Sequence, residues 1–111
     1  MNEPTMTIDN FGNKRWFLND ELHREDGPAI EYKDGTKSWH LNGKLHREDG
    51  PAVEYADGTK SWYVRGTRHR EDGPSFENVN GTKSWHLDDK QLSESEFRIQ
   101  MRIIKLKKMG L

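Results

Sequence analysis

Histidine and acidic residues recur together in this sequence at a spacing that could serve metal binding or acid–base chemistry. The run LHREDGPA occurs twice and its variant RHREDGPS once, so an aspartate follows three residues after His23, His46 and His69. A zinc site needs three or four ligands that converge at about 2 Å, and a catalytic site needs one asymmetric constellation with a perturbed group. Three equal copies fit neither. We therefore expect imidazole and carboxylate to fix the turn before each Gly-Pro, and we predict no catalytic residue, no metal site and no cofactor.

The histidine runs belong to a longer internal repeat. Aligning residues 12-34 on 35-57 gives 16 identities in 23 positions without a gap. A fixed period of this kind is the signature of a repeat array. The tryptophans and histidines that recur at this period are expected to be structural, and they are Trp16, Trp39, Trp62, Trp85, His23, His46 and His69. We predict a lead-in at 1-11 and an array at 12-92, made of units 12-34, 35-57 and 58-80 and a partial unit 81-92.

Each unit has the sequence pattern of two short strands joined by turns. Lys37, Trp39 and Leu41 alternate with polar residues, and Asn42-Gly43 supplies the residues that a tight hairpin turn requires. The Gly-Pro step then interrupts pairing, because proline has no backbone donor. The predicted fold class is mainly β, an antiparallel β-hairpin repeat meander that advances about 10 Å per unit. We expect Trp and Leu to form one apolar ribbon with Ile30, Val53 and Phe76.

The segment 93-111 is predicted to be a C-terminal α-helix that covers one end or face of the sheet. Ser93 and Glu96 form a capping box, and Gly110 lies beyond the expected end near Lys108. Phe97, Met101 and Ile104 share one side of this helix. A second apolar side, made of Ile99, Ile103 and Leu106, is more than capping requires and indicates a contact surface for a partner or a homodimer.

Composition restricts the class of protein and its location. The chain has 111 residues, of which 33% are charged, and no cysteine, so disulfides and thiolate chemistry are excluded. No segment approaches the roughly 20 apolar residues of a membrane span, and we expect a cytoplasmic protein that makes no membrane contact. Five of the 18 basic residues lie in 97-111, which holds no acid, whereas all 19 acids lie upstream. The body is acidic and the tail is basic.

The repeat resembles the MORN repeat, whose pattern here reads Tyr32, Gly35, Trp39, Asn42-Gly43, His46 and Gly50. It is most similar to the bacterial and bacteriophage variant that writes HREDGPA where the eukaryotic repeat has a histidine-glycine step. This departure argues against carrying over lipid binding from the eukaryotic proteins. The resemblance implies a hairpin array for binding or scaffolding. Among similar bacterial proteins are antitoxin-like adaptors, and short phage-borne members are candidate inhibitors of host factors.

These observations favour a non-catalytic protein-binding module with a bacterial protein partner, and not an enzyme. Its concrete form would be a phage or mobile-element protein that inhibits a host defence factor, for example of CRISPR type, in the host cytoplasm. An antitoxin-like bacterial adaptor is one alternative, and a nucleic-acid binder that uses the basic helix is another. The predicted partner-binding residues are Tyr63, Arg65, Arg68, Arg70, Arg98, Ile99, Arg102, Ile103, Lys105 and Leu106.

Overall fold

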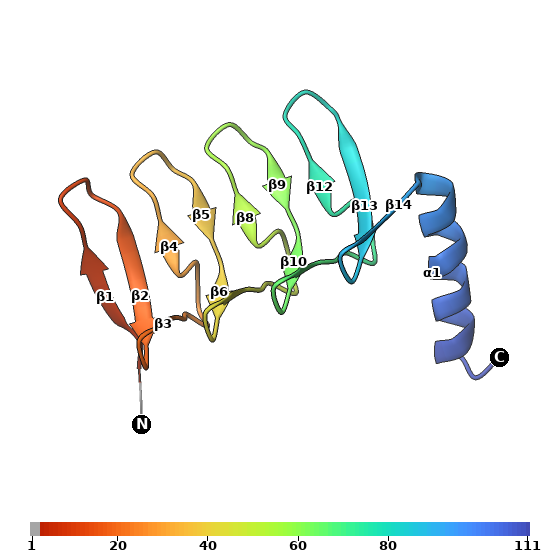
Figure 1. Cartoon of the computed structure of the whole chain (residues 1–111), viewed down its shortest axis with the longest axis horizontal. Coiled ribbons are helices and arrows are strands. Elements are labelled where there is room, and N and C mark those ends of the chain that lie inside the picture. The colour runs from red at the N-terminus through yellow and green to blue at the C-terminus, as the bar shows by residue number, and fades with distance from the viewer. Residues whose placement is uncertain (1–2) are drawn as a thin grey trace.

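The computed structural model describes residues 3–111 as a row of β-hairpins that ends in one helix. Figure 1 shows the hairpins standing side by side in chain order, with helix α1 (Glu94–Lys108) beyond the last of them. The molecule is a flat body of 51 × 38 × 18 Å. The antiparallel β-hairpin meander and the C-terminal helix expected from the sequence are confirmed.

Most strands belong to one ten-stranded antiparallel sheet. Its strands are β1 (Thr5–Ile8), β2 (Lys14–Leu18), β3 (Glu21–Leu22), β4 (Ile30–Glu31), β5 (Lys37–Ser38), β8 (Val53–Glu54), β9 (Lys60–Ser61), β12 (Phe76–Glu77), β13 (Lys83–Leu87) and β14 (Lys90–Leu92). Two separate short hairpins are formed by β6 (His40–Leu41) with β7 (Lys44–Leu45) and by β10 (Tyr63–Val64) with β11 (Thr67–Arg68). Strand β1 pairs with β2, so the predicted lead-in contributes the first strand of the sheet. Within residues 3–111, no helix combines the length and the apolar character needed to cross a membrane.

Two kinds of turn alternate along the array and set its period. The hairpin between β6 and β7 turns at Asn42 and Gly43, whose φ angles of 51° and 79° are those of a type I′ turn. The same place in the third unit is held by Arg65, whose φ of 50° is uncommon for this residue type. The turn between β4 and β5 uses Gly35 at φ 98° instead. The predicted Asn-Gly turn is therefore present as expected.

The expected apolar ribbon of Trp with Ile30, Val53 and Phe76 is wrong. Ile30 lies directly opposite Ser38, and Val53 lies opposite Ser61, so these pairs share one face of the sheet. Trp39, Trp62 and Trp85 each follow such a serine, and Trp16 follows Arg15, which also pairs with Ile30, so the tryptophans point to the other face. The strands break at Trp39 and Trp62, whereas Trp16 lies within β2 and Trp85 within β13. The core is consequently two-sided, with small residues such as Ala29 and Ala52 fully buried.

An arginine covers the ring of the tryptophan in each of the first three units. The Arg47 guanidinium carbon lies 3.8 Å from the centroid of Trp39, and the same stacking recurs at 3.8 Å for Arg24 on Trp16 and at 3.9 Å for Arg70 on Trp62. A cation over an indole face is attracted by the negative face of the ring. We call this arrangement the arginine clamp.

The arginine clamp also satisfies the polar groups of the loop that follows it. Arg47 Nη1 donates to the Pro51 carbonyl at 3.0 Å and to Glu54 Oε2 at 2.9 Å, and Arg47 Nε donates to Asp49 Oδ1 at 3.1 Å. The guanidinium fork can make all these bonds because its donors are rigidly arranged in one plane. The loop between the histidine and the proline is thereby tied to its own strand.

The histidines of the repeated run join neighbouring units, which differs from the expected role. His23 Nδ1 accepts from the backbone N–H of Asn42 at 2.9 Å, and His46 Nδ1 accepts from that of Arg65 at 2.9 Å. Each bond reaches the turn of the next unit. The aspartate of the run is bound by the arginine instead, because its side chain lies beside Nε of the clamp.

We expect Arg47→Ala to lower the free energy of unfolding by about 2–3 kcal/mol, because it removes the Trp39 contact and leaves Glu54 and a carbonyl unpaired. Urea unfolding followed by circular dichroism measures this. The control is Lys37→Ala, which removes an exposed cation and should cost about 0.5 kcal/mol or less. Equal effects of the two substitutions would show that the clamp does not stabilise the array.

Candidate functional site

The side chains most capable of acid–base chemistry are buried or tied into the array. Ser75 Oγ and His86 Nδ1 lie 2.6 Å apart, which is the distance of a nucleophile and its base. Ser75 is 1% exposed and His86 4%, so this pair is closed to a substrate. Among the described residues, no group of three or more His, Asp or Glu side chains is arranged to hold a metal ion.

Two buried histidines occupy equivalent positions but differ in their partners. Burial lowers the pKa of both His40 and His86, because an imidazolium is poorly solvated there. His86 has the Ser75 hydroxyl beside it, whereas two units earlier the residue at the position equivalent to Ser75 is Ala29, which offers His40 no hydroxyl. Within residues 3–111, neither ring nitrogen of His40 has a hydrogen-bond partner.

A different kind of site lies between α1 and the third and fourth units. An open groove of about 840 Å³ is walled on one side by loop residues 71–74 and on the other by the helix. Trp85, Phe97 and Met101 lie in its lining together with Arg102, Lys105 and Leu106. We call this feature the helix groove.

The helix groove exists because the fourth unit lacks the repeated run. Ser93 stands 23 residues after Arg70, so the fourth unit has no arginine to clamp Trp85. The Ser93 hydroxyl instead caps α1 by accepting from the Glu96 N–H at 3.1 Å, and Glu96 Oε1 accepts from the Ser93 N–H at 2.9 Å. Phe97 on the first turn is 7% exposed. The helix therefore occupies the place that the next loop would take.

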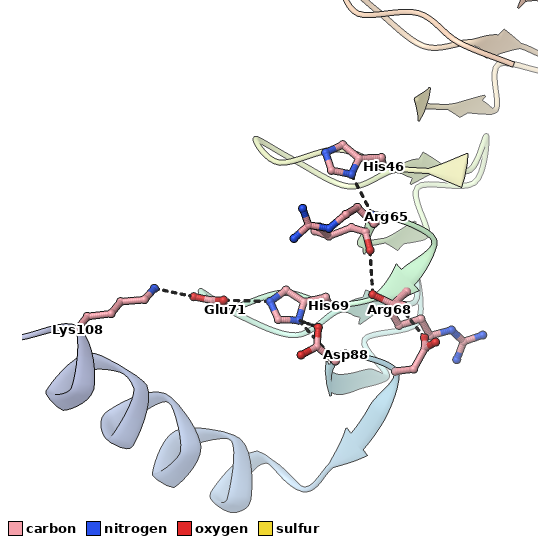
Figure 2. A network of polar contacts seen from close by, with 10 residues as sticks. His46, Arg65, Arg68, His69, Glu71, Asp88 and Lys108 are labelled. Atoms are coloured by element: carbon pink, nitrogen blue, oxygen red, sulfur yellow. Dashed lines mark hydrogen bonds and ion pairs between the residues drawn. The ribbon is translucent and has the colours of Figure 1, made fainter. Parts of the chain in front are cut away.

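The end of α1 is fastened back onto the third unit. Figure 2 shows Lys108 reaching Glu71, whose carboxylate also contacts His69. The distances are 3.3 Å from Lys108 Nζ and 3.0 Å from His69 Nε2, and the backbone N–H of Asp88 donates to His69 Nδ1 at 3.0 Å. The bonds from His69 and then from Lys108 lower the pKa of Glu71. The helix is thus held at both of its ends.

The predicted partner-binding residues fall into separate places. Arg98, Arg102, Lys105 and Leu106 all line the helix groove. Ile99 lies on the other side of α1 in a small hollow with Leu87 and Leu92, and Ile103 is 39% exposed.

The third-unit candidates are not among the residues that line the helix groove. Tyr63, Arg65 and Arg68 belong to the β10–β11 hairpin, where the Tyr63 hydroxyl accepts from Arg68 Nε at 3.3 Å. Arg70 is engaged in the clamp on Trp62. The groove residues that sequence reasoning missed include Lys83, Trp85 as a lining residue, and Met109, together with the loop 71–74. The signal that could have found them is the absence of an arginine at position 93.

Comparisons of the chain with protein-family models, with curated proteins and with solved structures found no match.

We expect the free energy of unfolding to fall as the pH is lowered from 7.5 to 5.5. The unfolded histidines take up protons near pH 6.5, whereas buried His40 and His86 resist protonation, so protons favour the unfolded chain in this window. His40→Phe, which places the residue type of Phe17 at the equivalent position, should flatten this dependence. Urea titrations at each pH measure it, and an unchanged slope in the variant would contradict the role of His40.

Ala29→Ser should stabilise the protein by about 1 kcal/mol, because it offers His40 the hydroxyl that Ser75 offers His86. Ala52→Ser is the matched control, since that position is equally buried but is followed at the equivalent place by Tyr63. Thermal and urea unfolding compare the two variants. A gain no larger than that of the control would show that His40 does not need this partner.

Proposed function

We propose that this chain is a non-catalytic protein-binding module in which the repeat array is a rigid mount and the helix groove is the recognition surface. The proposal is based on the lining of the helix groove, where apolar and basic side chains lie together. The apolar ones are Trp85, Met101 and Leu106, and the basic ones include Arg102 and Lys105. Tryptophan and arginine are enriched at the centres of protein interfaces.

The rigidity of the mount supports this proposal. Each arginine clamp ties a loop to its own unit, and each histidine ties that unit to the next, for example through His46 Nδ1 and the Arg65 N–H. Binding to a preorganised surface costs less conformational entropy, because the surface is already ordered before the partner arrives. The array therefore holds the binding surface in one conformation before a partner binds.

The resemblance to the bacterial and phage variant of the MORN repeat gives the proposal its concrete form. In that form, the chain is a small phage or mobile-element protein that acts in the host cytoplasm and inhibits a host defence factor by covering part of its surface. An antitoxin-like adaptor would use the same groove on a different partner. Both forms require a protein ligand.

Site-specific photo-crosslinking in bacterial cells tests the proposal. A benzophenone amino acid is placed at Leu106 in the helix groove, at Ile99 on the other side of α1, and at Val79, which is exposed at a hairpin tip. We expect one protein adduct from Leu106 that is absent from Val79, because only the groove position would face the partner.

The three positions also separate the alternatives. An adduct from Ile99 alone would move recognition to the other side of the helix, and an adduct of twice the mass of the chain would indicate a homodimer. Nucleic acid recovered at Leu106, with binding that collapses between low and moderate salt, would favour the nucleic-acid alternative. The absence of any adduct at the three positions would reject a protein-binding role for this end of the molecule.

A further inference from the structure

We propose that the helix groove binds an acidic peptide segment that carries an aromatic or aliphatic anchor residue. This inference rests on the proposed function and specifies the chemistry of the partner. It follows from which charges in the groove are already paired within the protein and which are left for a ligand.

The acidic residues of the groove are all engaged by the chain's own cations. Glu71 pairs with Lys108 at 3.3 Å, Asp72 with Arg70 at 2.8 Å, and Glu94 with Arg98 at 2.6 Å. An acid that is already paired repels an approaching anion much less than a free one does. The acidic wall is thus largely neutralised before a ligand arrives.

Three cations of the groove remain available. Within residues 3–111, no carboxylate lies within ion-pair distance of Lys83, Arg102 or Lys105, although all three line the groove. Cationic side chains beside an apolar surface attract an anionic ligand most strongly where water is partly excluded. The helix groove therefore carries an excess of unpaired positive charge, which favours binding of a negatively charged peptide segment.

Apolar side chains of the groove provide a place for an anchor. Trp85 lies between the loop wall and the helix, and Met101, Leu106 and Met109 line the helix side. Leu106 is 42% exposed and Met109 70%. Methionine adapts to differently shaped partners because its side chain is unbranched and polarizable, so a Phe, Tyr or Leu of the ligand could be accommodated.

The two other grooves on the same face lack this character. One lies over Trp39, where Arg24 and Arg47 are used in clamps and Glu25 has no ion-pair partner among the described residues. The other lies over Trp62, where Arg65 is the one cation outside a clamp among the described lining residues and faces a lining with four acidic residues, Glu48, Asp49, Glu71 and Asp72. Binding of an acidic segment should accordingly be confined to the helix groove, where α1 replaces an acidic loop.

Nuclear magnetic resonance with the ¹⁵N-labelled full chain tests the inference. The probe is a short synthetic peptide in which Glu and Asp flank one Phe and one Leu, added to about 1 mM so that weak binding is visible. We expect shift changes at the Trp85 indole N–H and at Met101, and little change at residues 24–28. A peptide with Ser in place of Phe and Leu should bind at least about fivefold more weakly.

Matched charge reversals on α1 identify the site. Lys105→Glu should weaken peptide binding by about fivefold or more, whereas Lys107→Glu, which makes the same charge change outside the groove, should alter it less than about twofold. The inference is overturned if no shift occurs at about 1 mM, if the two reversals act equally, or if the Ser peptide binds as well.

The outcomes distinguish this inference from the proposed function. If the peptide fails while a protein adduct forms at Leu106, the groove binds protein by other chemistry and only the acidic segment is rejected. If the peptide does not bind and no protein adduct forms at Leu106, both this inference and the proposed function are rejected. If the chain doubles in mass without peptide and Lys105→Glu prevents this, a second copy occupies the groove.

Discussion

The stacking of an arginine on a tryptophan is the interaction on which the repeat depends. The opposite face of the sheet carries Ile30 with Ser38 and Val53 with Ser61, so the large apolar area of Trp39 needs a cover of its own, and the methylene stem and guanidinium of Arg47 provide it. The same guanidinium binds Glu54 and the Pro51 carbonyl, so one side chain covers the ring and closes the loop. This explains how a chain with 33% charged residues folds around so few apolar ones.

The end of the repeat follows from the loss of that interaction. Once position 93 is serine, the chain has no guanidinium for Trp85, and the same serine is well suited to begin a helix. Phe97 enters the core in place of a polar loop. A repeat array needs a terminal element that differs from its units, and here that element brings a row of basic residues beside an acidic loop.

Much of the architecture could be predicted, and some of it could not. The 23-residue period, the Asn42-Gly43 turn and the capping box at Ser93 are local features, and the structure contains each of them. The face on which the tryptophans lie could not be read correctly, because the alternation of Lys37, Trp39 and Leu41 does not reveal the register that sets Ile30 opposite Ser38. The helix groove was likewise hidden, since Lys83 and Lys105 are distant in sequence.

The sequence by itself determined the units, their turns and the boundaries of the helix, because these depend on dihedral preferences and hydrogen bonds within a few residues. Only the tertiary structure decided which charged side chains are paired within the protein and which are left available to a ligand. Arg70 and Arg102 are the same residue type, yet one is enclosed by Trp62 and Asp72 while the other lines an open groove. That difference arises from the packing of α1 against the last units, where segments distant in the sequence meet.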